Sequence, residues 1–480
     1  MEKREIKKEV FLIAILSCFA CLIRIYKLST LMPFYGDVGR DFLVAKNILT
    51  EHQFPLFGPP TSLGWLRLGP LVYYLWALAF LIWGFQPVSI AYLVILFDLG
   101  TMVLIYLFGF RFLDRRKGFI AALLYAFSPL AIFHSRIALH TSLSPFFVML
   151  TVLFFSYWLD TKKERFLYLS FFAAGLMLQT HLAMGIIVFC LLFHLLLKEK
   201  GAGKIFRSFL FLLIPLIPLL FADFAQKRFM MAKFIAWIPY RVLSFFGILT
   251  AKNVFTFKRG LKTIQVFASS IQKTIFLPNQ FLSCFLLFIS LLYSYRLVKK
   301  NKIMKFLLTT ILFSAVTFFI HGEPQEHYLI FLVPFFALFL SNFLVDLLKG
   351  RFLALAFFLL VFILSINIVS LVRFNYYVTV GVNPLKFSYG IPLGQQIGIM
   401  KFIIKDSGDE SYQIINPPDM MALTALYENY RYLGWWLGKE EKEDGILKYR
   451  IYGRKHAILS LKEGEEMIEF PSTFVVKRIE

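Results

Sequence analysis

The sequence predicts an all-α polytopic membrane protein that ends in a small α/β domain. Hydrophobic residues make up 59% of its 480 residues and charged residues only 17%, whereas soluble domains average roughly 45–50% and about 25%. Apolar runs such as Phe11–Leu28, Leu143–Leu159 and Phe352–Val372 have the length that crosses a bilayer as a helix. Runs of this kind recur along the chain and predict about 11–13 transmembrane helices.

The basic charge follows the positive-inside pattern of membrane proteins. The net charge is +22, and the Lys and Arg residues lie in short segments between apolar runs rather than on one soluble face. We therefore expect membrane lipids as partners and no nucleic acid. The pattern assigns these basic clusters to the cytoplasmic side: Lys3–Lys8, Lys162–Arg165, Lys198–Lys204, Arg296–Lys305 and Lys349–Arg351.

The segments between these clusters are expected outside the cytoplasm. They are the first loop (30–67), the turn at 179–181, the stretch around 223–279, the loop at 322–327 and the chain after about residue 374. The apolar runs at about 68–84 and 88–110 conflict with the basic segment that follows them, so one of them should not cross fully. We therefore divide the chain into a transmembrane domain, 1–373, in the cytoplasmic membrane and an extracytoplasmic α/β domain, 374–480.

Polar and Pro-rich stretches predict the local elements. The apolar block Phe166–Leu197 is about twice too long for one span and is interrupted by Gln179-Thr180-His181. This pattern predicts a helical hairpin or two short helices that meet at the outer surface. Basic residues interleaved with aromatics over 223–279 favour a helix in the membrane interface, with a solvated loop as the alternative. In the last hundred residues or so we expect a helix over Gln395–Lys405, a strand over Tyr412–Ile415, a helix over Met420–Tyr427 and a strand over Ala457–Ser460.

The densest group of ionisable residues opens the first outer loop, in the run Tyr35-Gly36-Asp37-Val38-Gly39-Arg40-Asp41-Phe42. Asp37 and Asp41 are four residues apart, so on a helix both carboxylates share one face with Arg40 beside them. A carboxylate held near a cation keeps a low pKa and can act as a base. The alternative is an N-cap followed by an exposed helix start.

Further polar clusters are expected on the same side of the membrane, where ionisable groups are functional candidates. Arg67 precedes the Gly69-Pro70 start of an aromatic helix and could bind a phosphate or extend to lipid headgroups. Arg136 and His140 are four apart, so a helix would present both to one side. The remaining candidates are Gln179, His181, Glu326, His327 and Tyr328. For a lone histidine, a hydrogen-bonded structural role is the alternative.

The order of these motifs resembles the GT-C superfamily of membrane glycosyltransferases. It is similar in particular to the protein-mannosyltransferase-like group, glycosyltransferase family 39, which also resembles lipid A aminoarabinose transferase. The resemblance covers about residues 10–350 and adds little on the C-terminal domain. It implies an enzyme that transfers a sugar from a polyprenyl-phosphate carrier to an unknown acceptor, a protein, lipid or glycan, outside the cytoplasmic membrane.

The resemblance also implies roles for individual residues. Asp37 matches the catalytic base in the first outer loop of such enzymes, and Arg40 matches their arginine three residues later. Relatives often have Asp-Glu where this chain has Asp37-Val38, which leaves open whether Asp41 supplies the second carboxylate. His181 falls where the aminoarabinose transferases carry a phosphate-binding lysine, and Tyr328 where they carry an active-site tyrosine. Near an acidic position of theirs, this chain has His140 or Ser142 instead.

The residues themselves agree with that chemistry. Sugar transfer with inversion needs one base at the acceptor hydroxyl, here Asp37, and cations at the departing phosphate. Arg67, Arg136 and His181 could supply the positive charge, so a divalent metal is possible but is not required. A transporter or flippase of lipid-linked sugars is the main alternative, although its charges should lie near the membrane midplane on repeated broken helices. An O-antigen ligase or polymerase is a second alternative.

Overall fold

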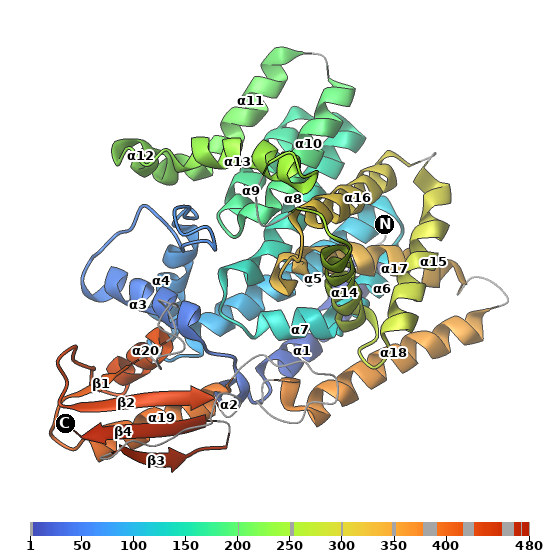
Figure 1. Cartoon of the computed structure of the whole chain (residues 1–480). Helices are drawn as coiled ribbons and strands as arrows, with labels where there is room; N and C mark the ends of the chain where they lie inside the picture. The colour runs from blue at the N-terminus through green and yellow to red at the C-terminus, as the bar shows by residue number, and fades with distance from the viewer. Residues whose placement is uncertain are drawn as a thin grey trace.

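The chain is described here by a computed structural model that covers residues 3–199, 201–249, 254–298, 301–347, 352–377, 391–415, 427–453, 465–471 and 473–479. Helices form the first part of the chain, and a small sheet with two helices forms the last part (Figure 1). The predicted fold class is therefore confirmed.

The helices of the first part differ widely in length. In chain order they are α1 (Lys3–Ile25), α2 (Leu28–Leu31), α3 (Gly36–Thr50), α4 (Leu71–Trp83), α5 (Ser89–Phe112), α6 (Arg115–Ala126), α7 (Pro129–Ser135), α8 (Ser144–Thr161), α9 (Glu164–Leu178), α10 (Gly185–Lys198), α11 (Ala202–Leu213), α12 (Ile217–Ala225), α13 (Met230–Phe245), α14 (Phe257–Ile275), α15 (Gln280–Val298), α16 (Lys302–His321), α17 (Val333–Leu347) and α18 (Leu353–Arg373). Short 3-10 turns lie between some of them: η1 (His140–Leu143), η2 (Leu182–Met184), η3 (Ile214–Leu216), η4 (Glu326–Tyr328), η5 (Ile330–Leu332) and η6 (Asn375–Tyr377).

Fewer of these helices qualify as full membrane spans than the apolar runs suggested. By length and composition, six helices in the described residues can cross a bilayer, or up to eight if each of two bent helix pairs forms one span. The expected number was about 11–13. The difference arises because several apolar runs are divided into shorter helices, as in α6 and α7, which meet at an angle of 60°.

Two expectations about local structure agree with the helices. The block 166–197 forms the hairpin of α9 and α10, and Gln179 and His181 lie at its turn, as predicted. Of the two apolar runs after residue 68, α4 has only 13 residues, too few for the roughly 20 that a span needs. This is the segment that the charge pattern expected not to cross fully.

The bundle is organised around α17, which is buried on almost every side and packs against α5, α6, α8 and α15 (Figure 1). Helices at the periphery expose large apolar side chains instead: Phe281 on α15 is 79% exposed and Phe357 on α18 is 61% exposed. An apolar exterior around an apolar core is what a lipid environment permits. The molecule is therefore a multi-pass membrane protein.

The stretch expected in the membrane interface forms helices α12, α13 and α14. Asp223 caps α13, because its carboxylate accepts hydrogen bonds from the backbone N–H groups of Met230 and Met231 at 2.8 and 3.1 Å. On α14, Phe257 and Ile264 are exposed while Lys273 is buried. Helical structure replaces the solvated loop that was the alternative, and the interfacial position remains a prediction.

The C-terminal part is a four-stranded sheet with the order β1-β2-β4-β3 and two helices. Its elements are α19 (Leu393–Asp406), β1 (Tyr412–Ile414), α20 (Glu428–Trp436), β2 (Leu447–Gly453), β3 (Glu465–Glu469) and β4 (Thr473–Ile479). β1 and β2 are parallel, and the other pairs are antiparallel. The expected helix 395–405 and strand 412–415 are present. The strand expected over 457–460 and all but the last residue of the helix expected over 420–427 lie outside the described residues. The sequence did not predict α20 or the last three strands.

Candidate active site

Helix α3 carries an arginine between two carboxylates. Arg40 donates one hydrogen bond to Asp37 Oδ1 at 2.6 Å and two to Asp41 Oδ1, at 2.9 Å from Nε and 2.7 Å from Nη2. The side chain of Asp37 is 54% exposed, whereas that of Asp41 is fully buried. The predicted helical pairing is therefore present, and the N-cap alternative is wrong, because Tyr35 precedes the helix and Asp37 lies in its first turn.

The two carboxylates differ in chemistry because they differ in burial. Burial raises the pKa of Asp41 to about 6, although the charge and hydrogen bonds of Arg40 partly offset this effect. Tyr73 on α4 donates a long hydrogen bond of 3.4 Å to the same oxygen of Asp41. Asp41 is thus fixed from two helices and holds Arg40. Asp37 keeps its second oxygen available to solvent or to a substrate.

A second cluster is made of aromatic rings contributed by segments far apart in the sequence. The ring centroid of His181 lies 4.5 Å from that of Tyr328, 6.1 Å from that of His327 and 6.1 Å from that of His140, whose ring is parallel to it. His321 is 6.2 Å from Tyr328. We call His140, His181, His321, His327 and Tyr328 the histidine cluster. The turn η1, the α9–α10 turn and the α16–α17 loop, which the sequence placed on one side of the membrane, therefore meet at this cluster.

The histidine cluster is close to the acidic group on α3. His140 lies within electrostatic range of both His327 and Arg40. Burial lowers the pKa of His327 to about 4 and that of His181 well below its usual value. Both rings are therefore neutral near pH 7, so His181 can accept or donate hydrogen bonds but does not supply the positive charge that was expected of it.

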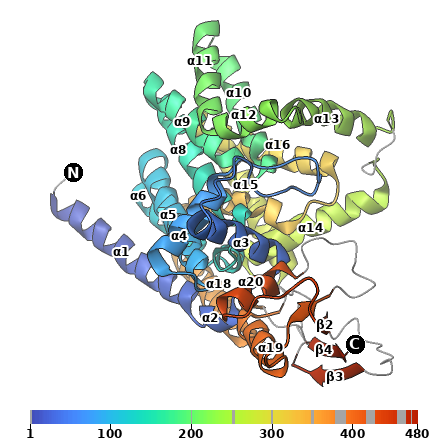
Figure 2. The same ribbon diagram turned by 90° about the vertical axis from the view of Figure 1, so that its left-hand side faces the viewer.

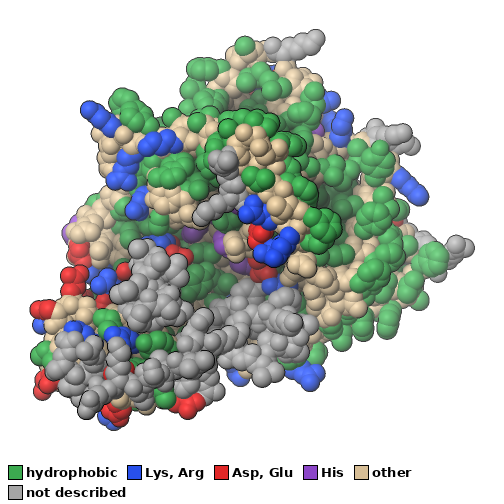
Figure 3. Space-filling view, viewed as in Figure 1, with side chains coloured by type: hydrophobic (Ala, Val, Ile, Leu, Met, Phe, Trp, Pro, Cys, Tyr) green, Lys and Arg blue, Asp and Glu red, His purple; other side chains and the backbone are tan. Residues whose placement is uncertain are grey.

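An ion pair that the sequence did not reveal borders this cluster. Lys273 of α14 donates a hydrogen bond to Glu326 Oε2, and His134 Nε2 of α7 lies 3.5 Å from Glu326 Oε1. Burial alone would raise the pKa of Glu326, but the hydrogen bond from His134 and the charge of Lys273 outweigh it and lower that pKa to about 2. Glu326 therefore stays ionised. Figure 3 shows histidine side chains beside acidic and basic ones in the middle of one face of the molecule.

Arg67 lies in a turn that leads into α4. The turn is closed by backbone hydrogen bonds between Gly58 N–H and Leu68 C=O at 2.8 Å and between Leu68 N–H and Pro59 C=O at 3.0 Å. The half-buried side chain of Arg67 makes no hydrogen bond or ion pair within the described residues, and it is within electrostatic range of Tyr73. Among the predicted phosphate ligands, Arg67 could therefore bind a phosphate without losing a hydrogen bond or ion pair that the described residues show.

Arg136 has a structural task, and its expected pairing with His140 on one helix is wrong. Helix α7 ends at Ser135, and His140 begins η1. Arg136 follows the end of α7, and its Nη1 donates to the carbonyl oxygens of Arg24 and Tyr26, at 2.7 and 2.8 Å, at the carboxyl end of α1. A cation at this end of a helix is favourable.

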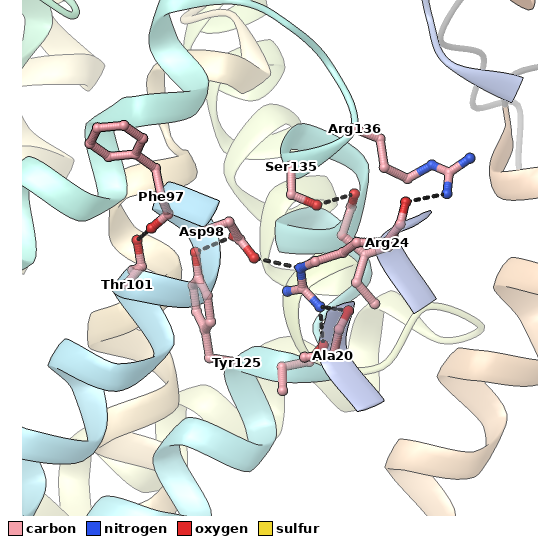
Figure 4. A network of polar contacts seen from close by, with 10 residues as sticks. Ala20, Arg24, Phe97, Asp98, Thr101, Tyr125, Ser135 and Arg136 are labelled. Carbon is pink, nitrogen blue, oxygen red and sulfur yellow. Dashed lines mark hydrogen bonds and ion pairs between the residues drawn. The ribbon is translucent and has the colours of Figure 1, made fainter. Parts of the chain in front are cut away.

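The carboxyl end of α1 is also held by a buried polar network, drawn in Figure 4. Arg24 binds Asp98 of α5 and the carbonyl oxygen of Ala126 at 3.0 Å, and Tyr125 donates to Asp98 at 2.7 Å. Arg136 joins this network by donating from Nη1 to the backbone oxygen of Arg24. A paired, hydrogen-bonded group of this kind fixes α1, α5 and α6 relative to one another.

Gln179 joins three segments and does not extend into the histidine cluster. Its Oε1 accepts from the N–H of Leu71 at 3.1 Å, and its Nε2 donates to the carbonyl of Pro215 at 2.8 Å. A Cβ on Gly69 would lie 2.3 Å from that Oε1, so glycine is needed where the chain enters α4. These bonds give Gln179 a structural role, and its substrate-binding role stays a prediction.

The arrangement can accept a proton at Asp37, bind an anion at Arg67, and offer neutral rings as hydrogen-bond partners to a polar ligand. No group of three or more His, Cys, Asp or Glu residues positioned for a metal ion occurs in the described part of the chain. Lys273, His134 and Tyr73 were not among the predicted site residues. His134 stands in the same polar segment as Arg136, Tyr73 stands in the aromatic run after Gly69-Pro70, and a basic, amphipathic pattern surrounds Lys273.

The chain is similar to known proteins in part of its sequence and in its fold. Residues 68–226 match the family model of dolichyl-phosphate-mannose-protein mannosyltransferases. No curated protein matches the chain. The chain resembles solved structures of ArnT from Cupriavidus metallidurans. The apo state matches with a TM-score of 0.63 and 10% identity over 98% of each chain. The form bound to undecaprenyl phosphate matches with a TM-score of 0.57 and 11% identity over 97% of each chain.

The chain is also similar to the apo oligosaccharyltransferase of Archaeoglobus fulgidus, with a TM-score of 0.50 and 14% identity over 83% of this chain. It spans only 58% of that protein's length. At these identities the structural likenesses show the fold alone.

Proposed function

With the resemblance to the GT-C superfamily confirmed by the fold and by the match over residues 68–226, we propose that the chain is a glycosyltransferase whose donor is a polyprenyl-phosphate sugar. The sugar passes to a hydroxyl group of a protein, lipid or glycan acceptor on the extracytoplasmic side of the membrane. The undecaprenyl phosphate bound to the similar ArnT structure supports a polyprenyl-phosphate carrier.

The observation that carries the proposal is that the two carboxylates on α3 differ in accessibility. Asp41 is buried and binds Arg40, so Arg40 is fixed, while Asp37 accepts one hydrogen bond from Arg40 and is 54% exposed. A carboxylate that is both oriented and accessible is what a general base requires. A purely structural ion pair would not need a second carboxylate held open at the surface.

The proposed step balances as follows. Asp37 removes the proton from the acceptor hydroxyl while that oxygen forms a bond to the anomeric carbon of the sugar. The bond between this carbon and the phosphate oxygen breaks, and its electron pair leaves with polyprenyl phosphate. Since negative charge builds up on the leaving phosphate, a cation at that point lowers the barrier. Arg67 is assigned this role.

The histidine cluster is assigned to the sugar. Neutral imidazoles and a phenol donate and accept hydrogen bonds without attracting a second anion, and their rings pack against the apolar face of a pyranose. His181 and Tyr328 are the central pair, with ring centroids 4.5 Å apart. Lys273 neutralises the ionised Glu326, so the region around the histidine cluster carries little net charge.

The test is to incubate the purified protein with polyprenyl-phosphate sugars in lipid nanodiscs, together with acceptor candidates, and to measure released polyprenyl phosphate by mass spectrometry. Wild type should release it, and Asp37→Asn should not. Asp409→Asn, at an exposed aspartate of the C-terminal domain, is the matched control and should behave as wild type. Movement of intact donor across the bilayer without release would contradict the proposal and favour a flippase.

A further inference from the structure

The C-terminal domain lies directly on the helix that carries the proposed base. Helix α20 packs along α3, as both ribbon views show (Figures 1 and 2). The contact is closest at Gly39, which precedes Arg40. A Cβ on Gly39 would lie 2.2 Å from the backbone nitrogen of Asn429 and 2.3 Å from its Cα. Backbone atoms cannot move aside as a flexible side chain can, so only glycine allows this approach.

Hydrogen bonds tie the two sides of this contact together. Asn429 Nδ2 donates to Gln396 Oε1 at 2.6 Å, and Gln396 Nε2 donates to the carbonyl oxygen of Phe34 just before α3. The N–H of Leu393 donates to the carbonyl of Met32 at 2.9 Å. The segment that enters α3 is thus bonded to α19 and, through Gln396, to α20.

Aromatic packing extends the contact to α4. The ring of Tyr432 lies 5.2 Å from that of Phe42 on α3 and stacks on Phe80 of α4 at 5.9 Å, and its hydroxyl donates to the carbonyl of Phe85 at 2.6 Å. Lys46 lies 5.2 Å from the ring of Trp435. Helix α3 is therefore enclosed between α4 and α20.

We propose that the C-terminal domain is a working part of the catalytic site, in which α20, seated on Gly39, fixes the position of Asp37, Arg40 and Asp41. Gly39 and Tyr432 are positioning residues. Without α20, α3 would keep its sequence and charges but lose one of its two walls. The proposal rests on the proposed function for its catalytic consequence, although the mechanical coupling can be measured without any substrate.

The experiment compares Gly39→Ala with Gly398→Ala in the full-length protein. Gly398 lies on α19, and a Cβ there meets nothing within 4 Å, so it controls for the generic effect of glycine to alanine in a helix. Hydrogen exchange followed by mass spectrometry reports protection of residues 36–50 and 428–436. Gly39→Ala should lose protection in both segments, and Gly398→Ala should not.

Kinetics test the catalytic consequence. Gly39→Ala should lower kcat by about 10²-fold, the effect of misplacing a reacting group by about 1 Å, with the KM for the donor within about threefold of wild type. Water reaches Asp41 once α20 is displaced and lowers the pKa of its carboxyl group. Since ionised Asp41 holds Arg40, the acid limb of the pH profile should then move to lower pH. Gly398→Ala should keep wild-type values. Tyr432→Phe, which removes only the hydrogen bond to Phe85, is the milder second variant and should shift kcat in the same direction.

The two readouts separate the possible failures. Unchanged protection of α3 in Gly39→Ala overturns the coupling whatever the activity. Loss of protection with wild-type kcat overturns the positioning role. If the wild type transfers no sugar from any donor while Gly39→Ala still exposes α3, the proposed function fails and the coupling is supported.

Discussion

Asp41→Asn should separate catalysis from stability. The substitution keeps the shape of the side chain and one oxygen that can accept from Arg40, but it removes the charge. Arg40 then pairs more strongly with Asp37, the only carboxylate left to it on α3. The ion pair that Asp37 already makes with Arg40 would thus hold the proposed base more tightly, and transfer should slow while the fold persists.

The expected size follows from the two hydrogen bonds that Arg40 donates to Asp41. Hydrogen bonds to a charged group contribute about 1.5–3 kcal/mol, which corresponds to a fall in kcat of about 10- to 150-fold. The stability effect has the opposite sign. Burial raises the pKa of Asp41 from 3.8 to about 6, so the folded protein binds the Asp41 proton more tightly than the unfolded chain does. The stability gained from this protonation is complete below pH 3.8 and is lost as the pH rises through 6. At pH 7 the ionised carboxylate therefore costs about 3 kcal/mol, a cost that an amide avoids.

The assay measures polyprenyl phosphate release and the melting temperature on the same preparation at pH 7. We expect a 10- to 150-fold lower kcat and a Tm equal to or above that of wild type. Wild-type turnover would refute the role of Asp41 in holding Arg40. A Tm lower by more than about 5 °C, the shift that about 1 kcal/mol gives in a small domain, would show that the residue is mainly structural.

Three further predictions follow from the site and the topology. Arg67→Ala should raise the KM for the donor by about tenfold or more, because a charge-assisted bond to phosphate is lost; an unchanged KM would leave Arg67 to lipid headgroups. A cysteine at Gln325, in a background lacking the four native cysteines, should react with an impermeant thiol reagent in intact cells, whereas one at Lys163 should react only after permeabilisation, and the reverse pattern would place the site in the cytoplasm. His327, whose pKa is lowered to about 4, takes up its proton more readily when unfolded, so wild type should lose stability between about pH 6.5 and 4, and His327→Gln should lose less in thermal melts over that range.

Local spacing predicted the parts of the site that lie on one element. Asp37, Arg40 and Asp41 fall within five consecutive residues, so helical periodicity alone places them together. The hairpin turn at Gln179 and His181 was predictable because polar residues are costly inside a long apolar run.

Long-range contacts and competing bonds account for the rest. Glu326 and Lys273 are 53 residues apart, and no local pattern indicates that they pair. Arg136 was expected at the phosphate because it is a cation near the membrane surface, but the carbonyls at the end of α1 hold it instead. The docking of α20 on Gly39 depends on a close approach between the backbones of α3 and α20, and no single residue type in α20 indicates this approach.

A paired measurement of donor binding and turnover decides whether Asp37 is the base. Binding of a radiolabelled polyprenyl-phosphate sugar and its turnover are measured on the same sample of Asp37→Asn protein. We expect donor affinity within about threefold of wild type and a loss of turnover of at least about 10²-fold, since a positioned base contributes about 10²–10⁴-fold. Turnover near the wild-type rate would contradict the role of Asp37 as the base.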